Sequence, residues 1–183
     1  VTRLYESFEF GEAGRTLYNF IWNDFCDWYI EMAKEVLYGD DQAAIANKRY
    51  NLAYVLDQTL RLLHPVMPFV TEEIWQSMPH TGDSIVNAAY PEVHAELDDP
   101  EATTQMNALI DLIRSVRNIR SEANAPLSKP IDVLVNIQDA PLMRIFKQNQ
   151  DFIERFVHPK SLEIAEGLTA PALAKTTDNG CLR

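Results

Sequence analysis

The sequence has few of the residues on which disulfide frameworks, metal centres and membrane spans depend. Its 183 residues include only two cysteines, Cys26 and Cys181, which lie far apart and without the spacing of a metal site. We therefore expect no structural disulfide, and a reducing cytoplasmic location fits best. No run of about eighteen apolar residues occurs, so no membrane span is predicted.

Positive charge is also scarce. The sequence has 16 Lys and Arg residues and 27 Asp and Glu residues, which gives a net charge of −11. Nucleic-acid affinity depends largely on phosphate neutralisation, so this balance taken alone argues against a nucleic-acid partner. A local basic patch in an acidic chain can still attract an anionic partner. One such patch lies between Asp111 and Lys129, where only Asp111 and Glu122 oppose four basic residues, namely Arg114, Arg117, Arg120 and Lys129. A solvated helix face, with the arginine stems packed along its edge, explains the same pattern.

Hydrophobic periodicity predicts a mainly α-helical protein. Apolar residues recur at steps of three and four in segments 11–38, 40–63, from 68 onward, and 99–123. Asp40 and Asp41 can cap the second of these helices, and Asp99 can cap the last one. The pattern then changes to a strand at 131–135, a helix at 141–157 and a second strand at 161–167. We therefore predict an antiparallel helical bundle over residues 1–125, followed by a small α/β appendage over 126–183.

Motifs for catalysis are missing. The sequence contains no glycine-rich phosphate loop, nucleophile elbow or zinc-ligand spacing. His64, at a helix end, is expected to be a capping or core-edge group. Glu72 and Glu73 are expected in the first turn after Pro68, where acids complement the helix dipole. The chain by itself is therefore not predicted to be an enzyme or to bind a cofactor.

Aromatic residues crowd the first long helix. One row at helical spacing contains Tyr18, Trp22, Phe25 and Tyr29, and another contains Phe20, Ile21, Trp28 and Met32. Either row could pack inside the bundle or against a neighbouring domain, and packing is the simpler interpretation. Stacking on unpaired nucleic-acid bases is the functional alternative.

Three motifs together resemble the anticodon-binding region of the valyl-tRNA synthetase family of class I aminoacyl-tRNA synthetases. They are "LYNFIWNDFCDWYIEMAK" (17–34), "LLHPVMPFVTEEIW" (62–75) and "VRNIRSEANAPLSK" (116–129). The proline-rich second motif is shared with the synthetases for other branched aliphatic amino acids and for methionine, so it identifies the superfamily. "FCDWYIE" followed by "VRNIRSE" points to valine. Tyr90 departs from the family, whose members often have tryptophan there.

The resemblance implies a recognition domain cut from a longer chain. The parent enzyme would attach valine to tRNA with ATP and Mg²⁺ in a separate catalytic domain, whose His-Ile-Gly-His and Lys-Met-Ser-Lys-Ser signatures are absent here. Its implied partners are the anticodon loop of tRNA(Val) and the catalytic domain of the same chain, in a cytoplasmic monomer. The family usually ends in a coiled-coil arm, which this chain does not reach.

Side-chain chemistry and helix position then suggest the contact residues. The first long helix is expected to touch the anticodon loop through Arg15, Asn19, Asn23 and Phe25. Phosphate contacts are expected from Arg114, Arg117, Arg120 and Lys129. Two alternatives remain open at this point: the same domain of an isoleucyl- or leucyl-type synthetase, and a helical protein-interaction module with no RNA role.

Overall fold

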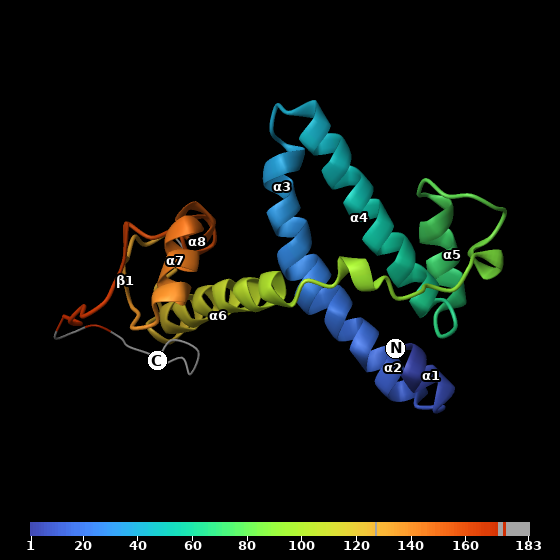
Figure 1. Cartoon of the computed structure of the whole chain (residues 1–183), viewed down its shortest axis with the longest axis horizontal. Helices are drawn as coiled ribbons and strands as arrows, with labels where there is room; N and C mark the ends of the chain where they lie inside the picture. Colours follow the sequence, from blue (N-terminus) through green and yellow to red (C-terminus); the bar gives the residue numbers. More distant parts are fainter. Residues whose placement is uncertain (127, 172–173, 175–183) are drawn as a thin grey trace. The chain divides into compact units, whose positions relative to one another are not determined.

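The computed structural model describes residues 1–126, 128–171 and 174, so Cys181 lies outside the described residues. The chain forms two compact units, Val1–Val93 and His94–Arg183. Helices dominate both units, and a two-stranded parallel sheet occurs in the second (Figure 1). The predicted fold class, a helical bundle followed by a small α/β appendage, is confirmed.

The first unit is built on a helical hairpin. Its elements are α1 (Thr2–Glu6), α2 (Phe10–Asn19), the π-helical segment η1 (Phe20–Ile30), α3 (Glu31–Leu37), α4 (Gln42–Leu63), α5 (Pro68–Gln76) and the short 3₁₀ helix η2 (Ile85–Asn87). The segments α2, η1 and α3 follow one another as one rod, which turns back into α4 (Figure 1). Asp41 caps α4 by accepting from the backbone N–H groups of Ala43 and Ala44 at 2.9 and 3.1 Å.

A proline shapes the corner between α4 and α5. Pro68 stands at the first position of α5, where the missing backbone N–H has no helical partner to lose. Thr71, in the first turn of α5, is fully buried. Its Oγ1 atom lies 2.8 Å from the Nδ1 atom of His64, the residue that closes α4. His64 is therefore a core-edge group, as the sequence predicts.

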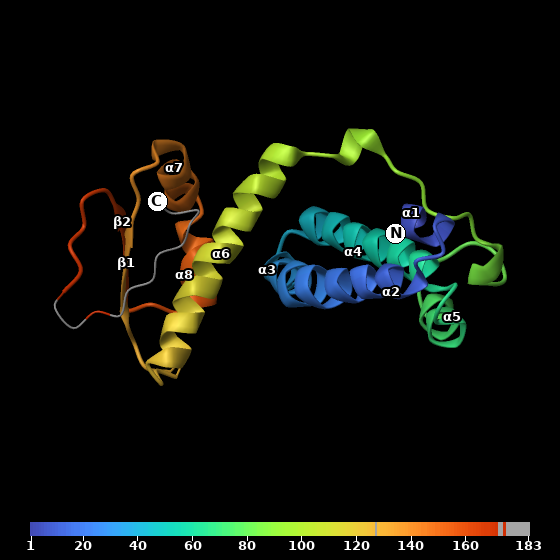
Figure 2. The same cartoon turned by 90° about the horizontal axis from the view of Figure 1, so that it is seen from below.

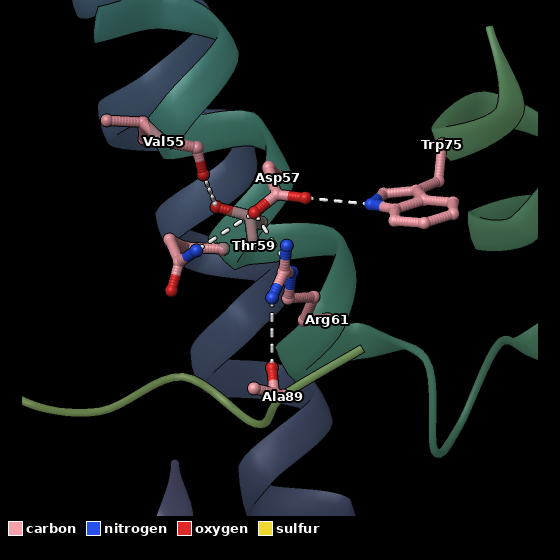
Figure 3. A network of polar contacts seen from close by, with 7 residues as sticks. Val55, Asp57, Thr59, Arg61, Trp75 and Ala89 are labelled. Carbon is pink, nitrogen blue, oxygen red and sulfur yellow. Dashed lines mark hydrogen bonds and ion pairs between the residues drawn. The ribbon is translucent and has the colours of Figure 1, made fainter. Parts of the chain in front are cut away.

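A polar network holds the same corner together (Figure 3). Trp75 is fully buried and donates its indole N–H to Asp57 Oδ1 at 2.7 Å. The other oxygen of Asp57 lies 2.9 Å from Arg61 Nε, and Arg61 Nη1 donates to the carbonyl of Ala89 at 3.1 Å. The network thus joins α4, α5 and the segment after η2.

Glu72 has a different role from the one expected. It is the fifth residue of α5, beyond the first turn, so it does not complement the helix dipole as predicted. Its carboxylate instead accepts from Gln76 Nε2 at 2.7 Å, Ser84 Oγ at 2.8 Å and the backbone N–H of Ile85 at 3.1 Å. These bonds fix the loop between α5 and η2.

The same bonds give a pH-dependent stability. Hydrogen bonds from Gln76 and then Ser84 lower the pKa of Glu72. A carboxylate with a lowered folded-state pKa stabilises the protein above its unfolded pKa, and the contribution is lost as the pH falls through the folded value. The urea midpoint of the unmodified protein should fall as the pH drops below about 4.3. We expect the urea midpoint of Glu72→Gln to fall less over the same range. Glu73→Gln, an exposed neighbour with the same charge change, should retain the fall; equal profiles for both variants would contradict this role.

The second unit is a helix packed on a βαβ-type appendage. Its elements are η3 (Ala95–Leu97), α6 (Pro100–Glu122), β1 (Asp132–Asn136), α7 (Ala140–Gln148), α8 (Gln150–Val157) and β2 (Ser161–Ala165). Asp99 caps α6 by accepting from the N–H of Ala102 at 2.9 Å, as predicted. β1 and β2 pair in parallel, with Asp132 opposite Ser161. Within this unit, α7 and α8 lie between α6 and the strands (Figure 2).

One feature of this unit differs from the sequence prediction. The single helix expected at 141–157 is two helices, because the backbone leaves helical geometry at Asn149, with φ −111° and ψ 26°.

The compact units divide between Val93 and His94. Helix α6 belongs to the second unit because it packs its apolar side against α7 and α8, burying a row that comprises Leu109, Ile110, Leu112, Ile113 and Val116.

The described residues form neither a membrane-spanning helix nor a metal-binding cluster. Within residues 1–126, 128–171 and 174, no helix is both long and apolar enough to cross a membrane. Nor does this part of the chain bring three or more histidine, cysteine or acidic side chains together in a way that could hold a metal ion.

Candidate nucleic-acid interface

The outward side of α2 and η1 carries the polar residues predicted to read RNA. Arg15, Asn19 and Asn23 follow one another at four-residue steps, and all three are exposed. Tyr18 and Trp22 lie beside them with 61% and 52% of their surfaces exposed. Their ring centroids are 6.2 Å apart at an interplanar angle of 53°. We call these five residues the outer face.

The inward side explains why this face is exposed. Ala13, Leu17 and Phe25 are buried and also recur in multiples of four. A π-helical segment closes its hydrogen bonds between residues i and i+5, so each turn holds more residues than an α-helical turn. Side chains four apart therefore stay aligned through η1, and the outer face remains continuous from α2 into η1.

Phe25 does not belong to the outer face. It is 7% exposed and packs with the ring of Tyr29, with centroids 5.9 Å apart. The aromatic row expected from the sequence therefore splits: its first two members are exposed, and the next one enters the core. Direct contact of Phe25 with RNA is not retained, because its ring is covered by the protein.

The electrostatics of the outer face suit bases better than phosphates. Arg15 donates to Glu12 at 2.6 Å, and both side chains are more than half exposed. Such an exposed pair contributes little to stability and can be exchanged for another partner. Asp24 and Asp27 are also exposed in η1. The face therefore presents amide groups and rings with little net positive charge.

The three arginines of α6 have different surroundings. Arg114 is half exposed, with Nη1 3.9 Å from Asp111 Oδ1. Arg117 donates from Nε and Nη2 to the carbonyl of Phe156 at 3.4 and 3.3 Å, and its guanidinium lies 5.5 Å from the centre of the Phe156 ring. Arg120 is only 3% exposed. The regular three-residue spacing thus does not produce one exposed stripe.

Arg120 is a structural residue in this unit. Its guanidinium donates to the carbonyls of Pro126 at 2.9 Å, Lys129 at 2.7 Å and Val157 at 3.3 Å. Direct phosphate contact by Arg120 is not retained, because these donors are directed inward. Lys129, by contrast, is exposed, and its backbone N–H closes a turn to Pro126 at 2.9 Å.

Comparison with known proteins identifies the family. A family model for the anticodon-binding domain of tRNA ligase matches residues 1–135. The chain belongs to this family. The anticodon-binding domain is 94% identical over 176 residues to a valine–tRNA ligase of Latilactobacillus sakei subsp. sakei (strain 23K), a match that covers 96% of the domain. It is 60% identical to the valine–tRNA ligase of Lactiplantibacillus plantarum and 57% identical to that of Enterococcus faecalis, over 96% and 95% of the chain.

The anticodon-binding domain spans about a fifth of the length of these relatives, since each match covers 20% of the longer protein. The family model covers the first unit and continues through α6 into β1 of the second unit. Tyr18 and Trp22 are members of the outer face that were not among the contact residues predicted from the sequence. The sequence placed both in an aromatic row for which base stacking was the functional alternative, and the structure leaves both rings exposed.

Proposed function

We propose that this chain is the anticodon-recognition domain of a valine–tRNA ligase and that its outer face reads the anticodon loop. The observation that carries the proposal is a pair of exposed aromatic rings, each next to an exposed asparagine, on one helical rod. Sequence-specific RNA recognition uses unstacked loop bases, which stack on aromatic rings and hydrogen-bond to side chains. Tyr18 and Trp22 offer the rings, and they are more than half exposed.

The asparagines supply the base discrimination in this proposal. Each side-chain amide offers an acceptor oxygen and two N–H donors, so it can match a base edge that presents both kinds of group. Arg15 stands one step before Asn19 and is free to exchange Glu12 for a loop phosphate, because that ion pair is exposed. Arg114 and Arg117 are outer residues of α6 and remain candidates for further phosphate contacts.

We infer that the domain acts within a longer cytoplasmic chain. The relatives named valine–tRNA ligase are about five times as long as the match. The remainder would hold the catalytic domain, in which ATP and Mg²⁺ activate valine, and the anticodon-binding domain would contribute tRNA selection alone. A monomer satisfies this arrangement, since one chain carries both parts.

Competition between tRNAs tests the proposal. In the full-length ligase, tRNA(Val) transcripts should outcompete transcripts that differ only in the anticodon by at least about tenfold, which corresponds to about 1.4 kcal/mol. The variants Asn19→Ala and Asn23→Ala should lower this ratio. A ratio of one would contradict the proposal, and a preference for an isoleucine or leucine anticodon would assign the domain to those ligases.

One observation favours a second candidate, a protein-docking role for α5. Val66, Val70 and Ile74 follow one another at four-residue steps and are 41, 43 and 40% exposed, and the neighbouring Phe69 is 90% exposed. Contiguous apolar surface of this kind is typical of an interface. We propose the catalytic part of the parent chain as its occupant, because the relatives carry four-fifths of their length outside the matched segment. Failure of the folded protein to bind any tRNA at low salt would favour docking as the main role.

A further inference from the structure

Arg120 brings together two segments that are distant in the sequence. The carbonyls of Pro126 and Lys129 belong to the connection between α6 and β1, and the carbonyl of Val157 ends α8. One guanidinium, 3% exposed, binds all three. Arginine suits this position because its planar group presents five donors in fixed directions.

The chain segments that enter the two strands are therefore neighbours. Beside the Arg120 contacts, the backbone N–H of Lys160 donates to the carbonyl of Ile131 at 2.7 Å. The parallel register then continues with Asp132 opposite Ser161. Lys129, His158 and Lys160 consequently lie at the same end of the sheet, and all three are exposed. We call these three residues the basic edge.

The charges around the basic edge are unusual for this chain. From 114 to 129 the sequence has four basic residues against Glu122 alone, and from 155 to 160 it has Arg155 and Lys160 with no acid, although the net charge of the chain is −11. Neither Lys129 nor Lys160 forms an ion pair within the part of the chain that the structure describes. The carboxylate at the same end, Asp132, accepts from Ser161 Oγ at 2.6 Å.

We propose that the basic edge binds phosphates of the tRNA backbone and that Arg120 is the positioning residue that assembles it. This inference rests on the proposed function. The outer face has little positive charge, since Arg15 is paired with Glu12 and Asp24 and Asp27 are exposed nearby. Base contacts specify a nucleic acid, whereas phosphate contacts supply affinity and orientation. The second unit supplies the positive charge that the outer face lacks.

The ammonium groups of Lys129 and Lys160 would each neutralise a phosphate, and the His158 ring would add an N–H donor. These contacts carry no sequence information. The basic edge should therefore contribute equally to tRNAs with any anticodon, in contrast to the outer face.

Salt dependence of tRNA binding tests the proposal. We compare the full-length ligase with its Lys129→Gln/Lys160→Gln double variant, using tRNA(Val) and a transcript with a changed anticodon. Each lost phosphate contact should lower the slope of log K against log salt by about 0.7–0.9, so the double variant should lose about 1.5. We expect the dissociation constant to rise about tenfold near 0.1 M salt for both tRNAs, with an unchanged anticodon preference.

The matched control is the double variant Lys34→Gln/Lys147→Gln. It removes the same charge from two exposed lysines outside the basic edge. Equal slopes for the two double variants would overturn the proposal, and so would a loss of anticodon preference caused by the basic-edge variant. If the unmodified ligase showed no preference for the valine anticodon, the proposed function would be overturned. The slopes of log K against log salt, measured with the changed-anticodon tRNA, would still test the basic edge.

The positioning role of Arg120 needs its own variant. Arg120→Lys retains the charge, but one ammonium group lacks the planar fork that reaches three carbonyls. For Arg120→Lys we expect the slope of log K against log salt to fall by about 1, although Lys129 and Lys160 are both present. Circular dichroism checks that the variant is folded. An unchanged slope in a folded Arg120→Lys variant would remove Arg120 from the proposal, and the lysine variants would still decide the rest.

Discussion

Trp75→Ala is expected to destabilise the first unit by about 3–5 kcal/mol, the usual cost of truncating a large buried side chain. Trp75 is fully buried, and its ring lies 4.0 Å from that of His80, measured between centroids. The substitution removes this contact and leaves a cavity between α4 and α5. It also removes the indole N–H that Asp57 accepts at 2.7 Å.

Urea unfolding followed by fluorescence measures this effect. The three tryptophans of the chain, Trp22, Trp28 and Trp75, all lie in the first unit, so two remain in the variant to report its unfolding. Trp75→Phe separates the two contributions, because it keeps most of the ring volume and loses the bond to a charged acceptor, which contributes about 1.5–3 kcal/mol. A loss below about 1 kcal/mol in Trp75→Ala would show that the corner does not depend on this side chain.

The corner shows what the sequence could and could not predict. The start of α5 at Pro68 and the capping acids Asp41 and Asp99 depend on local backbone chemistry, so they follow from neighbouring residues and agree with the sequence prediction. The partners of Glu72 lie four, twelve and thirteen residues away. Its loop-fixing role depends on how the chain returns after α5, which local patterns do not specify.

Helical spacing had the same limit in the candidate site. A period of 3.6 residues places Tyr18, Trp22, Phe25 and Tyr29 in one row, but η1 is π-helical and its wider turns change the alignment. The sequence likewise predicted phosphate contacts from Arg114, Arg117 and Arg120 of α6. Arg120 instead lies under the α6–β1 connection, a position set by the packing of α6 on α8. Spacing predicts a side chain's direction from the helix, but its neighbours determine whether it is exposed.

Trp22→Ala is expected to weaken tRNA(Val) binding to the full-length ligase by about 5- to 150-fold. Stacking of one base on an aromatic ring contributes about 1–3 kcal/mol, and each 1.4 kcal/mol is a tenfold change in affinity. The indole is 52% exposed and faces Tyr18, so its removal takes away half of the ring pair without opening the core. Titration of labelled tRNA with the variant, at fixed salt concentration, measures the loss.

The Trp22→Ala and Trp75→Ala variants serve as controls for each other, because one should change tRNA affinity and the other should change stability. Trp22→Ala should change the unfolding free energy by less than about 0.5 kcal/mol, as is usual for exposed positions, while Trp75→Ala should change it most. Phe20→Ala, at a less exposed aromatic position of η1 that is not part of the outer face, should leave tRNA affinity within about twofold. If Trp22→Ala retained full affinity and full anticodon preference while remaining folded, base stacking on the outer face would be ruled out. The asparagines alone would then have to account for recognition, and their amides would provide hydrogen bonds without a stacking surface.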